Sequence, residues 1–133
     1  MPPDDPRLED ARAWLARAEV DFRAADLELR NPEAGLWADV AFHAQQAAEK
    51  ALKALLASRD VPFRKTHSIE ELGRACLDAS PQLGPLVDAA APLTEYAWKF
   101  RYPGELGDPS RSEAEQAVAV SRRLVDAVTR LLG

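Results

Sequence analysis

Apolar residues recur at steps of three and four along most of this chain, which is the pattern of amphipathic helices. The pattern predicts a first helix over residues 8–29 and a second over residues 36–59. In the second, alanine and leucine dominate a broad apolar face, and the small side chains allow neighbouring helices to approach closely. The first seam consists of Leu8, Ala11, Leu15, Ala18, Phe22, Ala25 and Leu29. The second face consists of Val40, Ala44, Ala47, Ala48, Ala51, Leu52, Leu55 and Leu56.

Caps and prolines divide the second half of the chain. A capping box at Ser68 and Glu71 predicts a short third helix over residues 68–78. A fourth helix is expected over residues 85–99 with a kink near Pro92, since proline removes a helical hydrogen bond.

The last part of the chain predicts a loop followed by a helix. Residues 100–109 contain two prolines and two glycines, which are typical of a loop. A second serine-glutamate box then begins a last helix over residues 110–132. Because no strand-like alternation of useful length is present, we expect an all-α fold, a mainly up-and-down bundle of four to five helices.

Length and hydropathy indicate one domain over residues 1–133, which is long enough to bury a core. No apolar run approaches the roughly 20 residues of a membrane span. The first residues, MPPDDP, are unlike a secretory signal. We therefore expect a cytoplasmic protein that does not enter the membrane.

Charge and composition exclude several kinds of site. The net charge of −5 argues against coating nucleic acid by bulk electrostatics, although residues 36–67 carry five bases against three acids. The single cysteine, Cys76, excludes an internal disulfide and favours a structural role. Neither His43 nor His67 follows a glutamate by three residues, as a di-metal bundle requires, so we expect no metal site and no cofactor.

A row of polar side chains flanks the apolar face of the second helix: His43, Gln46, Lys50 and Lys53. Their spacing makes them neighbours on the helix surface. Two neutral hydrogen-bonding groups beside two cations could bind an anion. The alternative is an ordinary solvated flank in which Glu49 pairs with Lys53.

The predicted loop offers a second set of ligand-binding side chains. Arg101 has a planar guanidinium suited to phosphate, and Tyr102 has a ring on which a base could stack. The alternative is that both residues hold the loop against the bundle. His67 also has two interpretations, as a supporting ligand or as a packed, hydrogen-bonded neighbour of the third helix cap.

Three segments stand out by their order and spacing: AQQAAEKALKA at residues 44–54, THSI at 66–69 and RYP at 101–103. Together they resemble the HEPN domain family. The resemblance spans nearly the whole chain and implies a compact helical bundle that is often dimeric. It also implies a minimal nucleotidyltransferase as partner, in a toxin–antitoxin or stress system, and binding of RNA or nucleotides. The tryptophans near the edges of the apolar stripes are consistent with a homodimer.

One departure from the family bears on catalysis. Ribonuclease members carry an arginine, four to six residues and then a histidine. Here residues 102–108 after Arg101 contain no histidine, and neither His43 nor His67 follows an arginine at that distance. We therefore assign no catalytic residue.

The expected function is binding of a nucleotide or RNA phosphate without ribonuclease activity. The expected ligands are Gln46, Lys50, Lys53, Arg101 and Tyr102, with His43 and His67 in support. Two alternatives stay open. One is a metal-independent ribonuclease toxin in which His43 or His67 replaces the missing base. The other is a pure dimerisation module.

Overall fold

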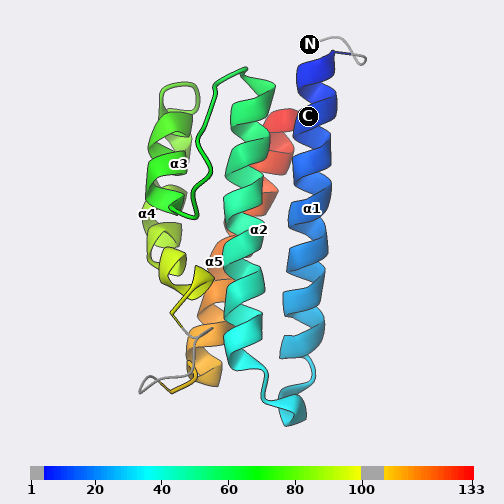
Figure 1. Ribbon diagram of the computed structural model, residues 1–133, viewed down its shortest axis with the longest axis vertical. Helices are drawn as coiled ribbons and strands as arrows, with labels where there is room; N and C mark the ends of the chain where they lie inside the picture. The colour runs from blue at the N-terminus through cyan, green and yellow to red at the C-terminus, as the bar shows by residue number, and fades with distance from the viewer. Residues whose placement is uncertain (1–4, 100–106) are drawn as a thin grey trace.

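The computed structural model describes residues 5–99 and 107–133, and in that part of the chain it is an all-helical bundle (Figure 1). Two long antiparallel helices and a third long helix carry most of the structure: α1 (Pro6–Leu29), α2 (Trp37–Ser58) and α5 (Arg111–Leu132). The shorter elements are η1 (Pro32–Ala34), α3 (Ile69–Leu77), η2 (Pro81–Leu83), α4 (Gly84–Ala90) and η3 (Ala91–Ala97). The predicted all-α bundle of four to five helices is confirmed.

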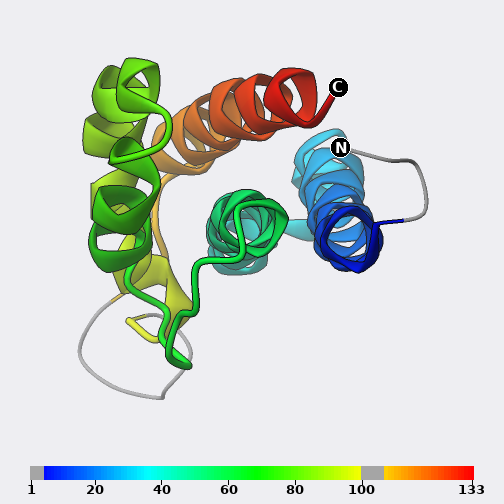
Figure 2. The same ribbon diagram turned by 90° about the horizontal axis from the view of Figure 1, so that it is seen from above.

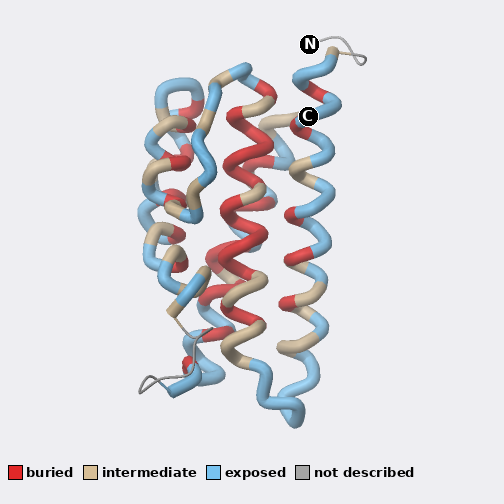
Figure 3. The backbone as a smooth tube through the Cα atoms, in the orientation of Figure 1, coloured by how far each residue is buried: buried red, intermediate tan, exposed pale blue. Residues whose placement is uncertain are grey.

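The second helix is the centre of the bundle. Figure 2 shows α2 surrounded by α1, α5 and the short helices, and Figure 3 shows burial along most of its length. The alanines at 41, 44, 47, 48, 51 and 54 are fully buried, so three neighbours can approach its backbone. Leu52, Leu55 and Leu56 are also buried, and each such side chain stabilises the fold by about 1.5–3 kcal/mol.

The starts of α3 and α5 follow their serine caps. Ser110 and Glu113 form a complete capping box at the start of α5. Ser68 caps α3 by accepting a hydrogen bond of 3.1 Å from the Glu71 amide. The Glu71 side chain does not return to the cap, because its carboxylate accepts hydrogen bonds from Arg64 instead. The predicted box of α3 is therefore half formed.

The predicted fourth helix is wrong in its second half. The chain forms α4 only as far as Ala90 and then continues as the 3₁₀ helix η3. Pro92 has no amide hydrogen to donate to the carbonyl of Asp88, so the α-helical ladder stops and the tighter helix replaces the predicted kink. Most of the predicted loop that follows lies outside the described residues.

Two small residues connect the short helices to the core. Gly73 of α3 lies so close to α4 that a Cβ there would overlap Val87 Cγ1. Cys76 is buried, with its Sγ 3.6 Å from the carbonyl oxygen of Leu52, and burial raises the pKa of its thiol to about 12. Cys76 is therefore a structural residue, as predicted.

Among the described residues, no helix is both long and apolar enough to cross a membrane.

Candidate functional site

The predicted polar row on α2 is divided between two networks. At about 100° per residue, His43 and Lys53 lie roughly 80° apart around the helix, so they meet different neighbours. The Asp21 network lies toward α1 and contains Asp21, Glu28, Asp39, His43 and Lys50. The Glu49 network lies toward the α2–α3 connection and contains Gln45, Gln46, Glu49, Lys53 and His67. The row is therefore not one continuous surface.

Asp21 of α1 is the centre of the first network. This carboxylate is only 8% exposed, and it accepts a hydrogen bond from Lys50 Nζ. Its other oxygen lies 2.8 Å from His43 Nδ1. A buried carboxylate requires partners of this kind, because desolvation strongly disfavours an isolated charge. Lys50 is thus an internal ion-pair partner, and it would have to leave Asp21 to contact a phosphate.

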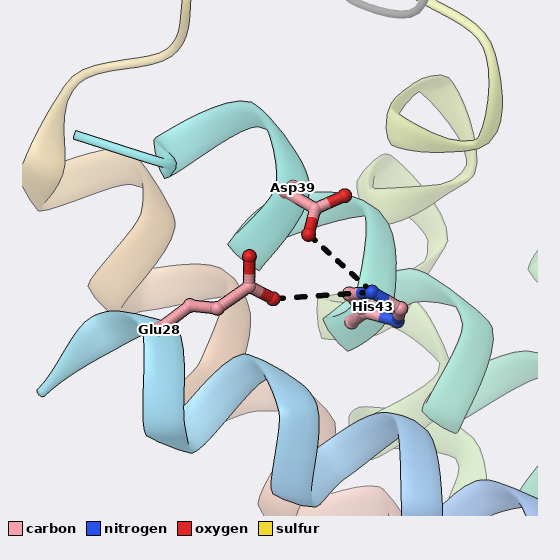
Figure 4. A group of neighbouring side chains, drawn as sticks. All are labelled: Glu28, Asp39 and His43. Carbon is pink, nitrogen blue, oxygen red and sulfur yellow. Dashed lines mark ion pairs between the residues drawn. The ribbon is translucent and has the colours of Figure 1, made fainter. Parts of the chain in front are cut away.

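The opposite edge of the His43 ring faces two more carboxylates. His43 Nε2 lies 3.5 Å from Asp39 Oδ2 and 3.8 Å from Glu28 Oε1 (Figure 4). Burial, together with the adjacent Asp39 carboxylate, raises the pKa of Glu28 to about 8. The α1–α2 end of the bundle therefore concentrates acidic groups around one imidazole.

Glu49 is the centre of the second network and is 2% exposed. It accepts hydrogen bonds from Gln45 Nε2 at 3.1 Å and from Lys53 Nζ at 2.9 Å. His67 Nδ1 lies 2.8 Å from the same carboxylate, although 65% of the His67 side chain is exposed. Gln46 donates to Gln45 Oε1 at 2.7 Å. The Glu49–Lys53 pair forms as the solvated-flank interpretation predicts, but inside the protein rather than on a solvated face.

A hollow of 350 Å³ opens beside the Glu49 network. It is lined by Trp14, Lys53, Lys65, Thr66 and His67, and we call it the Trp14 hollow. Lys53 Nζ lies 5.2 Å from the centroid of the Trp14 ring, within cation–π range. The hollow combines two ammonium groups, an imidazole, a hydroxyl and an indole, which is a set of groups suited to a phosphate next to an aromatic base.

Comparison with known proteins identifies the family. The HEPN domain model matches residues 11–131 of this chain. The chain belongs to the HEPN family. The match covers almost the whole chain, and it confirms the resemblance carried by the three sequence motifs.

Solved structures agree with this assignment. The crystal structure of TT1696 from Thermus thermophilus is 33% identical to this HEPN domain, with a TM-score of 0.79 over 90% of this chain and 96% of that one. ST0689, an archaeal HEPN homologue, is 24% identical, with a TM-score of 0.72 over 92% and 98% of the two chains, and shows the same fold. A search of curated proteins finds no significant match.

The predicted site residues of this HEPN domain are therefore distributed over separate places. Lys53 and His67 come together in the Trp14 hollow, whereas Lys50 and His43 lie in the Asp21 network. Gln46 is buried and lies in the Glu49 network. Arg101 and Tyr102 lie outside the described residues, so their predicted roles stay predictions.

Sequence reasoning missed Asp21, and it placed Glu49 in an ion pair on a solvated flank rather than in a buried network. Asp21 comes three residues after Ala18 and four before Ala25 of the apolar seam of α1, and it is 8% exposed. An acidic residue beside an apolar seam is the signal that could have identified it, since buried carboxylates need partners. The sequence gives no comparable sign that Trp14 and Lys65 lie close together, because only folding brings α1 to the α2–α3 connection.

Proposed function

We propose that this HEPN domain binds a nucleotide or an RNA phosphate in the Trp14 hollow and has no ribonuclease activity of its own. The observation that carries the proposal is the grouping of Lys53, Lys65 and His67 beside the Trp14 indole. Cations bind the phosphate in such sites, and the aromatic ring contacts the base without sequence preference.

The charge balance of the hollow favours an anionic ligand. Lys53 is largely used by Glu49, which leaves Lys65 as the exposed cation of the hollow's lining. His67 contacts Glu49 through Nδ1, so its Nε2 edge is the one available to a ligand. A single phosphate would therefore meet one full positive charge, one imidazole and the Thr66 hydroxyl.

The other predicted ligand-binding residues have secondary roles in the proposal. Arg101 and Tyr102 are proposed to add a guanidinium and a stacking ring from the loop. Gln46 is hydrogen-bonded within the Glu49 network and Lys50 within the Asp21 network, so neither is proposed to contact the ligand first.

Fluorescence anisotropy with a labelled short single-stranded RNA, competed by unlabelled ATP, tests the proposal. We expect Lys65→Gln to weaken binding roughly fivefold, since it removes one charged contact of about 1 kcal/mol. Arg123→Gln, at an exposed position of α5, removes the same charge elsewhere and should leave affinity within twofold of the wild type. No binding at millimolar ligand, or equal loss in both variants, would refute the proposal.

We further propose that this protein is a cytoplasmic homodimer that works with a minimal nucleotidyltransferase in a toxin–antitoxin or stress system. The family resemblance supports the partner. Val20 and Leu27, which are seven residues apart on α1 and each 62% exposed, support a self-association surface. Light scattering should give a dimer mass for the wild type and a monomer mass for a Val20→Asp/Leu27→Asp variant. Co-purification with a nucleotidyltransferase encoded next to it tests the partner.

A further inference from the structure

Three side chains with metal-ligating atoms converge where α1 ends and α2 begins. They are Glu28 from the last turn of α1, and Asp39 and His43 from the first two turns of α2 (Figure 4). One ligand atom from each lies within 4.8 Å of the others. The group therefore links two helices that are connected only by the short η1 turn.

The separations within this group are those of ligands around an ion. His43 Nε2 lies 3.5 Å from Asp39 Oδ2 and 3.8 Å from Glu28 Oε1, distances too long for strong hydrogen bonds. For an ion about 2.1 Å from each ligand atom, the two angles between the imidazole nitrogen and a carboxylate oxygen would be roughly 115° and 130°. Both angles are close to the angle of trigonal coordination, about 120°.

The residues behind the group orient it as the outer shell of a metal site does. A histidine ligand usually donates its second ring N–H to a carboxylate, which fixes the tautomer and aims the other nitrogen at the metal. Asp21 takes this position, 2.8 Å from His43 Nδ1, and Lys50 in turn holds Asp21. With Nδ1 facing Asp21, the nitrogen that faces Glu28 and Asp39 is the one that would coordinate a cation.

The two carboxylates of the group also favour a bound cation. Glu28 lies at the C-terminal end of α1, where the helix dipole disfavours a negative charge and the last turn holds no basic residue. The Glu28 side chain is only 17% exposed, and it faces the other carboxylate of the group, that of Asp39. A divalent ion between them would neutralise both carboxylates. Asp39, with 42% of its side chain exposed, leaves a solvent side for entry and for a water ligand.

We propose that Glu28, Asp39 and His43 bind one divalent transition-metal ion, with Asp21 as a positioning residue, and that the ion clamps the end of α1 to the start of α2. One imidazole with two carboxylates suits Zn²⁺ and its neighbours among the divalent first-row ions. The proposal departs from the sequence-based expectation of no metal. That expectation rested on the absence of a glutamate three residues before a histidine and on the small number of histidines. The carboxylates here belong instead to Asp39, four residues before His43, and to Glu28 on another helix.

This site is separate from the Trp14 hollow. Fourteen residues separate Trp14 from Glu28 along α1, which corresponds to about 21 Å of helix. The metal proposal therefore stands or falls independently of nucleotide binding.

Calorimetric titration of Zn²⁺ into chelator-treated protein, paired with thermal denaturation, tests the proposal. We expect one ion per chain and a higher Tm in Zn²⁺. The nearly isosteric variants Glu28→Gln and Asp39→Asn should each lose at least tenfold in affinity and lose the Tm increase. Glu70→Gln on α3 and Asp126→Asn on α5 are the matched controls at exposed positions, and they should bind as the wild type does.

Circular dichroism establishes that each variant is folded before titration. Should Asp39→Asn fail to fold, Glu28→Gln alone carries the test. The proposal is overturned if the wild type shows neither heat nor a Tm increase in Zn²⁺, or if Glu28→Gln binds Zn²⁺ as tightly as the wild type. It is also overturned if the control variants lose affinity as much as the ligand variants.

Discussion

Asp21 of α1 and Lys50 of α2 form an ion pair within the interface of the two helices, with His43 on the other oxygen of the same carboxylate. Lys50→Met should therefore lower the free energy of unfolding by about 2–3 kcal/mol, because it leaves a buried carboxylate with a single partner. Urea denaturation measures this loss.

A double variant and a surface control separate this effect from a general loss of charge. Asp21→Asn/Lys50→Met should regain at least half of the loss, since no uncompensated charge remains. Arg74→Met breaks the exposed pair with Glu70 and should change stability by less than about 0.5 kcal/mol. Strict additivity of the effects of Lys50→Met and Asp21→Asn, each measured alone, would contradict the interpretation.

Gly73 is required by the contact between α3 and α4. Gly73→Ala should destabilise the fold by about 1–3 kcal/mol despite its better helix propensity, because the new methyl group overlaps Val87. Gly84→Ala is the matched control, since its Cβ would meet only Leu77 Cδ2 at 4.0 Å. Denaturation midpoints should fall for the first variant and stay level or rise for the second. The opposite order would show that α3 and α4 are farther apart than described.

The end of α2 offers a stabilising substitution. Asp60 adopts a φ of 57°, while the amide of Val61 donates to the carbonyl of Leu56 at 3.0 Å, as in a Schellman motif. Glycine fits this left-handed position best, so Asp60→Gly should raise the free energy of unfolding by about 0.5 kcal/mol. Arg59→Gly, one residue earlier at negative φ, should give no gain. An equal gain at both positions would contradict the motif.

Helix positions were predictable from the sequence because their signals are local. The apolar repeat in α1 and the serine caps of α3 and α5 each depend on residues within a turn or two. The change from α4 to η3 was harder to predict, since Pro92 signals a disruption but not which helix type follows. Packing decides that.

The candidate site was only partly predictable because its contacts are distant in sequence. Lys50 and its partner Asp21 are 29 residues apart, and Glu49 and His67 are 18 apart. The spacing on α2 correctly placed the polar row beside the apolar face. It could not show which cations would be neutralised by carboxylates from other elements.

Catalysis is tested by incubation with labelled RNA. We expect the RNA to stay intact, since no histidine follows Arg101 at the spacing of the family's ribonucleases. In the described part of the chain, the His67–Glu49 contact orients a largely exposed imidazole by a buried carboxylate. RNA cleavage that disappears in His67→Ala and persists in Arg123→Gln would therefore contradict our proposal. It would support the alternative of a ribonuclease in which His67 replaces the missing base.

The location of the ligand is the central claim, and an NMR titration tests it most directly. Isotope-labelled protein is titrated with an unlabelled short single-stranded RNA while backbone amide and indole signals are followed. We predict that the largest shifts occur at the Trp14 indole and at the amides of Lys65, Thr66 and His67, with α5 unaffected. Shifts confined to α4 and α5, or none at millimolar RNA, would contradict the account.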